Sequence, residues 1–267
     1  MLFYEQFFNK IFLFLLVFSN GHVAFSKNIN VLILTAMDSE LEEINKLMSN
    51  KEEIVLKEYG LNKKIVKGKL SNRNVMASVC GTGKVNAGVW TSYLLSKYNI
   101  SHVINSGVAG GVISDKYKDI KVGDIVVSSE IAYHDVDLTK FGHKVGQLVG
   151  LPQKFVANKN LVNKAKEAVK LKVKGANAYS GLILTGDQFI DPIYIKKIIR
   201  DFKDVIAVEM EGAAIGHVAH MFNVPFIVIR SISDVVNKEE NEVEYSKFLK
   251  LASFNSAKVV QEILRIL

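Results

Sequence analysis

The stretch "VPFIVIRSISD" (Val224–Asp234) has the pattern of a buried β-strand that ends in polar residues. β-Branched and aromatic residues follow one another with little polar interruption, as in strands that are covered on both faces. Three other runs share this arrangement: "INVLILTAMDSE" (Ile29–Glu40), "SHVINSGVAGG" (Ser101–Gly111) and "GLILTGDQFI" (Gly181–Ile190). We expect a strand from about Asn30 to Ala36, and a short strand followed by a glycine loop over Gly107–Gly111.

Helical patterns alternate with these strands. Their apolar residues recur every three to four positions, as on one face of a helix. The segments are "DSELEEINKLM" (Asp38–Met48), "KVNAGVWTSYLLSKY" (Lys84–Tyr98), "LVNKAKEAVKL" (Leu161–Leu171), "GAAIGHVAHMF" (Gly212–Phe222) and "YSKFLKLASFNSAKVVQEILRIL" (Tyr245–Leu267). Asp38 is expected to cap the first of them. Alternating strands and helices predict an α/β fold with a largely parallel sheet between layers of helices.

The composition fits one globular domain. Hydrophobic residues make up 49% of the 267 residues, charged residues 23%, and there are only 3 prolines, unlike disordered or fibrous chains. A chain of this length can form a single α/β domain, and we assign residues 27–267 to it. Cys80 is the single cysteine and lies in an apolar run, so we expect a core residue and neither an internal disulfide nor a multi-thiolate metal site.

Residues 1–26 resemble a secretory signal peptide. An apolar run over residues 11–18 follows Lys10 and is too short to span a bilayer, which takes about 20 apolar residues. Ala24 and Ser26 are the small residues expected before a cut ahead of Lys27. We therefore expect export to the periplasm, the surface or the medium.

Other fates of this leader stay open. A cut after Gly21 is one of them, and Glu5 offsets the charge that Lys10 gives to the leading region. Two further alternatives are an uncleaved anchor and an extension from a misassigned start codon on a cytoplasmic protein.

Two lysine clusters dominate the positive charge, which is +7 for the whole chain. They are "NKKIVKGKLSNR" (Asn62–Arg73) and "NKAKEAVKLKVKG" (Asn163–Gly175). Two solvated faces are the simpler interpretation. The alternative is a patch for an anionic polymer, which for an exported protein means a sulfated glycosaminoglycan rather than nucleic acid.

Several polar and glycine residues follow apolar segments and are expected to meet in one pocket. "AVEMEGAAI" (Ala207–Ile215) places two carboxylates among small and apolar residues, although burying an unpaired carboxylate costs on the order of several kcal/mol. In open α/β sheets, ligands bind outside the carboxyl ends of the strands. The expected members of the pocket are Glu40, Gly107–Gly111, Phe189, Ile190, Glu209, Glu211 and Asp234.

Three of these groups, Glu40, Glu211 and Asp234, are carboxylates from distant parts of the chain. Acids in separate environments can hold different protonation states, which is what cleavage of a glycosidic bond requires. A phosphate P-loop is not indicated, because neither Gly81–Gly88 nor the glycine loop has the GxxxxGK[ST] spacing.

A metal site is not expected either. The best candidate cluster is His134 with Asp135 and Asp137 in "YHDVD", and local hydrogen bonding explains such a cluster more often than a metal does.

At these residues the chain resembles the 5′-methylthioadenosine/S-adenosylhomocysteine nucleosidases of the purine nucleoside phosphorylase superfamily. The matching segments run in the family's order over almost everything after the leader. They are "LTAMDSE", "GTGKVNAG", "INSGVAGGV", "KVGDIVVSSEIAYHDVDLTKFG", "GDQFI", "AVEMEGAAIGHVAH" and "VPFIVIRSISD".

The resemblance implies an α/β sandwich around a mixed twisted sheet, assembled as a homodimer. It implies hydrolysis of the N-glycosidic bond of both named substrates, with release of adenine and the 5-thio-ribose. No cofactor, metal or nucleic acid partner is implied.

The resemblance also assigns catalytic roles. Asp234 matches the general acid that protonates adenine N7, and Ser233 helps to hold it. Glu40 matches the base that activates the attacking water, and Arg230 a residue that holds the water network. N7 protonation is physically sensible, because adenine leaves poorly as an anion.

Substrate contacts follow in the same way. Glu211 matches the carboxylate that grips the ribose hydroxyls, and Met210 the side chain under the ribose. Phe189 matches the ring stacked on adenine, and the backbone of Ile190 the groups that read its edge. Glu209 is assigned a supporting role, and satisfied hydrogen bonding alone would also explain it.

The remaining substrate-binding candidates are Val108, Ala109, Gly110, Met37, Thr82, Leu138, Phe141 and His143. Val108 stands where many family members have serine, and Thr82 where a branched aliphatic residue lines the alkylthio pocket. His143 and Val149 fall in the loop that reaches across the dimer. These departures leave open the order of preference among methylthioadenosine, S-adenosylhomocysteine and 5′-deoxyadenosine.

Two other functions remain alternatives. A purine nucleoside phosphorylase needs cations around phosphate, whereas "MDSE" and "NSGVAGG" occupy those places and Glu40 would repel the anion. An exported glycan-binding adhesin with vestigial activity would use the lysine clusters, yet Glu40, Glu211 and Asp234 are all retained.

Overall fold

Strands and helices alternate along the chain. The computed structural model describes residues 30–58, 61–239 and 241–267, and the leader predicted over residues 1–26 lies outside these ranges. The strands are β1 (Asn30–Thr35), β2 (Ser49–Glu58), β3 (Leu61–Leu70), β4 (Arg73–Val79), β5 (His102–Gly111), β6 (Ile125–Tyr133), β7 (Phe155–Val156), β8 (Ala178–Thr185), β9 (Val205–Glu209) and β10 (Phe226–Val235). The helices are α2 (Asp38–Leu47), α3 (Lys84–Lys97), α4 (Lys159–Lys172), α5 (Tyr194–Asp201), α6 (Gly212–Met221) and α7 (Asn241–Ile266), with a 3₁₀ turn η1 (Thr139–Phe141).

The described strands form one mixed sheet. β1 pairs in parallel with β4 and β5, and the antiparallel β2–β3 hairpin extends the β4 edge. On the other side the sheet curls until it closes, because β5 pairs with β10, β10 with β6, β6 with β8, β8 with β9, and β9 again with β5. The predicted α/β fold around a mixed sheet is confirmed, and the closed ring is an additional feature.

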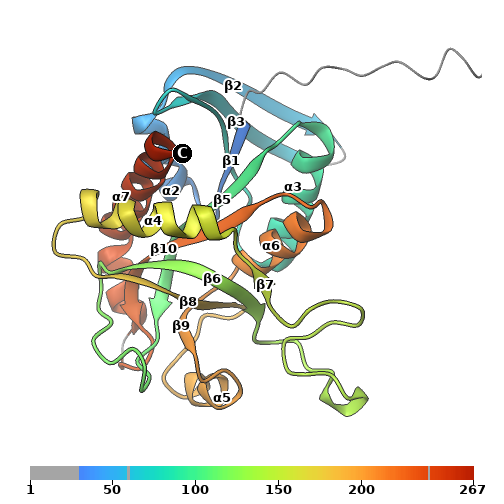
Figure 1. Cartoon of the computed structure of the whole chain (residues 1–267), viewed down its shortest axis with the longest axis vertical. Coiled ribbons are helices and arrows are strands. Elements are labelled where there is room, and N and C mark those ends of the chain that lie inside the picture. The colour runs from blue at the N-terminus through green and yellow to red at the C-terminus, as the bar shows by residue number, and fades with distance from the viewer. Residues whose placement is uncertain (1–29, 59–60, 240) are drawn as a thin grey trace, which may run out of the picture.

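Helices cover both sides of the sheet (Figure 1). α2, α4 and α7 pack on one side, where Leu41, Leu161 and Val260 belong to one apolar cluster. α3 and α6 pack on the other, where Trp90 and Ile215 belong to a second cluster. Within the described ranges, no helix combines the length and apolar content needed to cross a membrane.

Two local predictions were wrong. The segment Gly107–Gly111 is not a loop, because β5 continues to Gly111 with its backbone paired to β10 and β9. Asp38 is not the helix cap but the first residue of α2, after Met37. Glu40 supplies the cap instead, since its carboxylate accepts the N–H of Met37 at 3.0 Å. A carboxylate in the first turn can reach back to these unpaired N–H groups.

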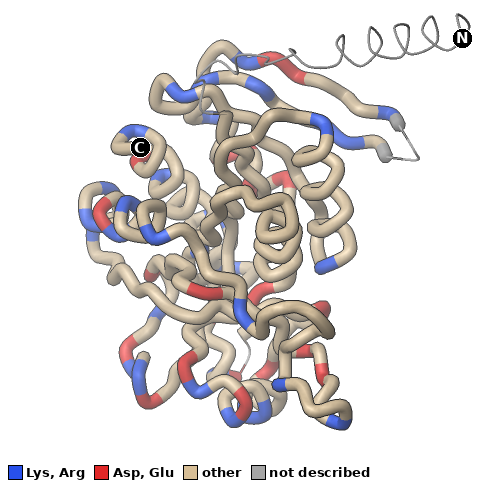
Figure 2. Tube along the Cα trace, turned by 45° about the vertical axis from the view of Figure 1, so that its right-hand side comes forward, with Lys and Arg blue, Asp and Glu red and all other residues tan. Residues whose placement is uncertain are grey.

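The two lysine clusters lie on different elements, one on β3 and one on α4 with the turn after it. Figure 2 shows that Lys and Arg are distributed over the chain with Asp and Glu among them. Lys64 pairs with Glu53 at 2.5 Å, and Lys63 Nζ donates to the backbone oxygen of Cys80 at 2.9 Å. Lys63 and Lys64 of β3 therefore have partners within the protein.

Candidate active site

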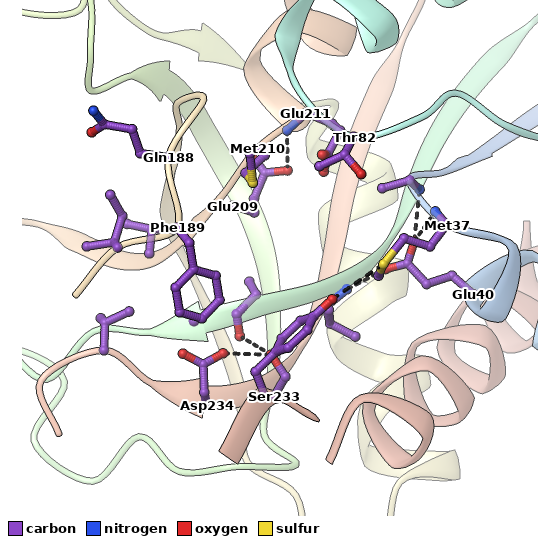
Figure 3. A pocket seen from close by; sticks show the side chains of 18 residues that line it. Met37, Glu40, Thr82, Gln188, Phe189, Glu209, Met210, Glu211, Ser233 and Asp234 are labelled. Atoms are coloured by element: carbon purple, nitrogen blue, oxygen red, sulfur yellow. Dashed lines mark hydrogen bonds between the residues drawn. The ribbon is translucent and has the colours of Figure 1, made fainter. Parts of the chain in front are cut away.

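One pocket lies at the carboxyl ends of the sheet strands (Figure 3). It collects residues from α2, β5, β9, β10 and α7 and from the segments after β1, β4, β8 and β9. The predicted residues that line it are Met37, Glu40, Thr82, Val108, Ala109, Gly110, Phe189, Ile190, Glu209, Met210, Glu211, Ser233 and Asp234. The predicted convergence of these segments is therefore present.

Ser233 and Asp234 both face the pocket because β10 is irregular at this point. Its register with β5 shifts between the pairs Ile232–Ala109 and Asp234–Gly110. Neighbouring side chains of a regular strand point to opposite faces, whereas an extra residue in a bulge redirects one of them. The bulge thus delivers two adjacent polar side chains to one side of the strand.

Asp234 is 1% exposed and is held at both carboxyl oxygens. Oδ1 accepts from Ser233 Oγ at 2.8 Å, and Oδ2 accepts from Asn241 Nδ2 at 2.9 Å. Burial raises the pKa of Asp234, and the two hydrogen bonds oppose that rise because they stabilise the carboxylate. A carboxyl group with a raised pKa keeps its proton to higher pH, as a general acid requires.

Glu40 is buried near the start of α2 and accepts three backbone hydrogen bonds. Oε2 accepts from Ala36 at 2.8 Å and Met37 at 3.0 Å, and Oε1 accepts from Val108 at 3.1 Å. Burial raises the pKa of Glu40, while the charge of Arg230 and these N–H groups oppose the rise. A raised pKa makes Glu40 more basic than an ordinary carboxylate.

Gly107 of β5 lies between Glu40 and Arg230. A Cβ at this position would overlap the Arg230 guanidinium and lie 2.6 Å from Glu40 Oε1. Only glycine leaves room for both charged side chains here.

Arg230 lies behind the pocket wall and is fully buried. It donates to Glu209 and, at 2.5 Å, to Asn105 Oδ1, and its Nη2 lies 3.5 Å from Glu211 Oε2. A buried guanidinium is stable only with such partners. Arg230 therefore joins the acids of "AVEMEGAAI" to the centre of the sheet.

Glu209 and Glu211 have different hydrogen-bond partners. The Glu209 carboxylate accepts from Thr185 Oγ1 and from the backbone N–H groups of Glu211 and Gly212, in addition to Arg230. These contacts fit the supporting role predicted for Glu209. Glu211 Oε1 accepts the N–H of Gly83 at 3.0 Å, and burial together with the charge of Glu209 raises the pKa of Glu211 to about 8.

Phe189 and Asp234 lie on one side of the pocket, across from Glu40 and Met37 (Figure 3). Phe189 is 51% exposed and makes an edge-to-face contact with Tyr245 at a ring-centroid distance of 5.8 Å. An accessible aromatic face beside a buried carboxyl group can stack on a flat base while the acid reaches its ring nitrogen.

Gly107 and Gly111 of β5 were expected in the pocket but do not line it. Three predicted substrate contacts are not brought to this pocket either. Leu138, Phe141 and His143 lie in and around η1 and do not line it within this chain. Phe141 is 79% exposed.

Sequence analysis missed several other members. Ala36, Gln188, Val208, Val236 and Tyr245 also line the pocket. Gln188 could have been found from its place beside Phe189 in "GDQFI". The apolar pattern predicts that the last helix starts at Tyr245, whereas α7 begins four residues earlier, so that Asn241 and Tyr245 lie on the same face.

The acids of the "YHDVD" cluster have structural partners, whereas His134 is buried and neither of its ring nitrogens has a hydrogen-bond partner among the described residues. Asp135 pairs with Lys84 at 2.6 Å, and Asp137 accepts from Thr139. No cluster of three potential metal ligands occurs in the described part of the chain. The Cys80 thiol is fully buried, which raises its pKa, so the expectation of a core cysteine is confirmed.

Comparison with known proteins agrees with this geometry. The model of the phosphorylase superfamily matches residues 30–265. A 5′-methylthioadenosine/S-adenosylhomocysteine nucleosidase of Anoxybacillus flavithermus is 39% identical over 233 residues, which are 87% of this chain and 96% of that protein.

Two solved structures are similar over 89% of this chain. One, from Borrelia burgdorferi B31, is described as a candidate nucleosidase of the same type bound to adenine; it is 51% identical, with a TM-score of 0.85 and all of its own chain covered. The other is the Neisseria meningitidis nucleosidase in complex with methylthio-immucillin-A, 36% identical, with a TM-score of 0.82 and 99% of its chain covered. The chain therefore belongs to the phosphorylase superfamily and, within it, to the 5′-methylthioadenosine/S-adenosylhomocysteine nucleosidases.

Proposed function

We propose that this pocket hydrolyses the N-glycosidic bond of 5′-methylthioadenosine and S-adenosylhomocysteine by protonating adenine N7 and directing water to the sugar. The observation that carries the proposal is the convergence of three buried carboxylates, Glu40, Glu211 and Asp234, on one pocket beside an accessible aromatic ring. Adenine in the Borrelia burgdorferi structure and methylthio-immucillin-A in the Neisseria meningitidis structure support the choice of ligand.

Asp234 acts as the acid. The adenine ring stacks on Phe189, and backbone groups at Ile190 contact its edge. The Asp234 carboxyl proton moves to N7, so that adenine leaves as a neutral base and the ribose takes on oxocarbenium character.

Glu40 acts on the attacking water. Its carboxylate takes a proton from the attacking water, and Arg230 holds the network in place through the contacts described above. Glu211 accepts hydrogen bonds from the ribose hydroxyls, with Met210 under the ring. The oxygen of that water then bonds to C1 of the sugar, which completes hydrolysis.

The side chains that line the pocket disfavour phosphorolysis. No Lys, Arg or His occurs among the described residues that line the pocket, and the one guanidinium behind it, that of Arg230, is already held by carboxylates. A phosphate dianion would face Glu40 without the basic groups that phosphate sites use.

The test compares adenine release from methylthioadenosine and S-adenosylhomocysteine with base release from inosine, on the chain that starts at Lys27. The proposal expects turnover of the two adenine nucleosides only. Failure to release adenine from either substrate would refute it.

A homodimer is part of the proposal. Phe141 and Val149 are 79% and 72% exposed in the single chain, and the predicted contacts Leu138, Phe141 and His143 lie outside its own pocket. In a dimer, the loop that contains these residues would complete the alkylthio end of the second subunit's pocket. Sedimentation should give twice the mass of the chain; a monomer with full activity would contradict this assignment.

A polyanion is a second candidate ligand, on a surface away from the pocket. Lys166, Lys170, Lys172 and Lys174 are exposed on α4 and the turn after it. If the leader exports the chain, we expect these lysines to retain the protein on immobilised heparin, with binding that weakens steeply as salt rises. Reversing the charge of Lys166, Lys170 and Lys174 should move elution to lower salt.

Charge reversal of Lys63, Lys64 and Lys67 on β3 is the matched control. These side chains are engaged with Cys80, Glu53 and Tyr98, so their reversal should change retention less. Elution at low salt that neither set of substitutions changes would leave an ordinary basic surface.

A further inference from the structure

Asn241, the first residue of α7, ties two parts of the pocket together. The residue is 2% exposed. Its Nδ2 lies 2.9 Å from Asp234 Oδ2 and 3.1 Å from the backbone oxygen of Ile190. β10, α7 and the segment after β8 therefore meet at one amide group.

The orientation of this amide follows from its partners. A backbone carbonyl can only accept a hydrogen bond, so the nitrogen of Asn241 rather than its oxygen faces Ile190. The second hydrogen of the same nitrogen is then available to Asp234 Oδ2. Both hydrogens of the side chain are used, one on each partner.

Ser233 and Asn241 make different kinds of hydrogen bond with Asp234. The Ser233 hydroxyl lies 2.8 Å from Asp234 Oδ1 and 3.3 Å from the backbone oxygen of Ala109. It has one hydrogen, so it either donates to the carboxylate or donates to Ala109 and accepts the proton of the neutral acid. The amide nitrogen of Asn241 can only donate, and it holds Oδ2 in place in both protonation states.

We propose that Asn241 is a positioning residue for the reaction: it fixes the carboxyl group of Asp234 and the backbone at Ile190 relative to each other, so that the proton donor and the groups at the purine edge act on one bound base. This inference rests on the proposed function, which assigns those two roles. A misplacement of about 1 Å at a reacting group can cost roughly a hundredfold in rate.

The same contact bears on the charge of Asp234. The donor at Asn241 stabilises the carboxylate, as does Ser233, whereas Glu244 on α7 raises the pKa of Asp234. Tyr245 of α7 lines the same pocket as Asp234, as do Glu40 and Glu211 from its other side. Loss of the Asn241 donor therefore raises the pKa of Asp234 above its present, already raised position.

The test is the pH dependence of kcat/KM for methylthioadenosine in Asn241→Leu, which keeps the approximate size and removes the donor. We expect kcat/KM at the optimum to fall roughly ten- to hundredfold. We also expect the alkaline limb, where Asp234 loses its proton, to move to higher pH. Asn241→Asp is the second variant; it has the same shape, lacks the donor and adds a like charge, so its limb should move in the same direction.

Asn237→Ala is the matched control. Asn237 lies four residues before Asn241. It makes paired hydrogen bonds with the backbone of Ile113, at 2.7 Å and 3.1 Å. Its loss should lower Tm without moving the alkaline limb. Folded Asn241 variants that keep the wild-type limb and rate would overturn the inference.

The variant Asp234→Asn separates this failure from failure of the proposed function. If Asp234→Asn is inactive while the Asn241 variants behave as wild type, only the role of Asn241 is wrong. If Asp234→Asn keeps its rate, the general acid is wrong, and the role of Asn241 with it.

Discussion

Asp234→Asn is expected to slow adenine release by roughly a hundredfold or more, which is the typical loss when a general acid is removed. The variant keeps the shape of the side chain but has no acidic proton for N7. It should fold, because the new amide can donate to Ser233 and still accept from Asn241. The effect is measured as the initial rate with methylthioadenosine, and Tm is measured on the same variant to show that it is folded.

The surface variant Asp204→Asn is the control for this substitution. Asp204 forms an exposed pair with Lys116 at 3.8 Å, so both rate and Tm should stay near those of the wild type. Near-normal turnover in folded Asp234→Asn would remove Asp234 from the catalytic step.

Glu40→Gln is expected to cause a loss of similar size, because the attacking water loses its base. Binding of the nucleoside should be largely kept, since the proposed partner of Glu40 is the water. The uncharged amide cannot accept all three backbone bonds, and we expect a loss of stability of about 1 to 3 kcal/mol. Rates are compared with calorimetric titration of a methylthioadenosine analogue whose glycosidic bond is not cleaved.

Glu43→Gln makes the same chemical change on the same helix, away from the pocket. Glu43 is 7% exposed and bonds Lys46 at 2.8 Å, so its loss should affect stability and not turnover. If affinity and rate collapse together in Glu40→Gln while Glu43→Gln is active, Glu40 is a ligand contact and not the base.

Much of the fold could be predicted because its strands are nearly continuous apolar runs. The strand at Phe226–Val235 is buried at every position, and its apolar pattern is visible without knowledge of its neighbours. The same holds for Asn30–Thr35, and Glu40, which follows that strand, meets Asp234 near the end of Phe226–Val235 in the pocket. Local pattern and strand-end geometry were sufficient for these elements.

Features that depend on distant pairing could not be predicted in this way. The glycines of β5 have the pattern of a loop, and only their pairing with β10 and β9 makes them a strand. The bulge that turns both Ser233 and Asp234 into the pocket is a matter of register between two strands. Asn241 gains its importance from Asp234 and from Ile190, which lies 51 residues away in the chain.

The most direct test of hydrolysis is adenine release from methylthioadenosine while inorganic phosphate is raised from none to a large excess, with the sugar product identified by phosphorus NMR and mass spectrometry. A pocket whose acids direct water predicts the same rate throughout and free 5-methylthioribose as the only sugar product. A rate that requires phosphate, with 5-methylthioribose 1-phosphate as the product, would contradict it.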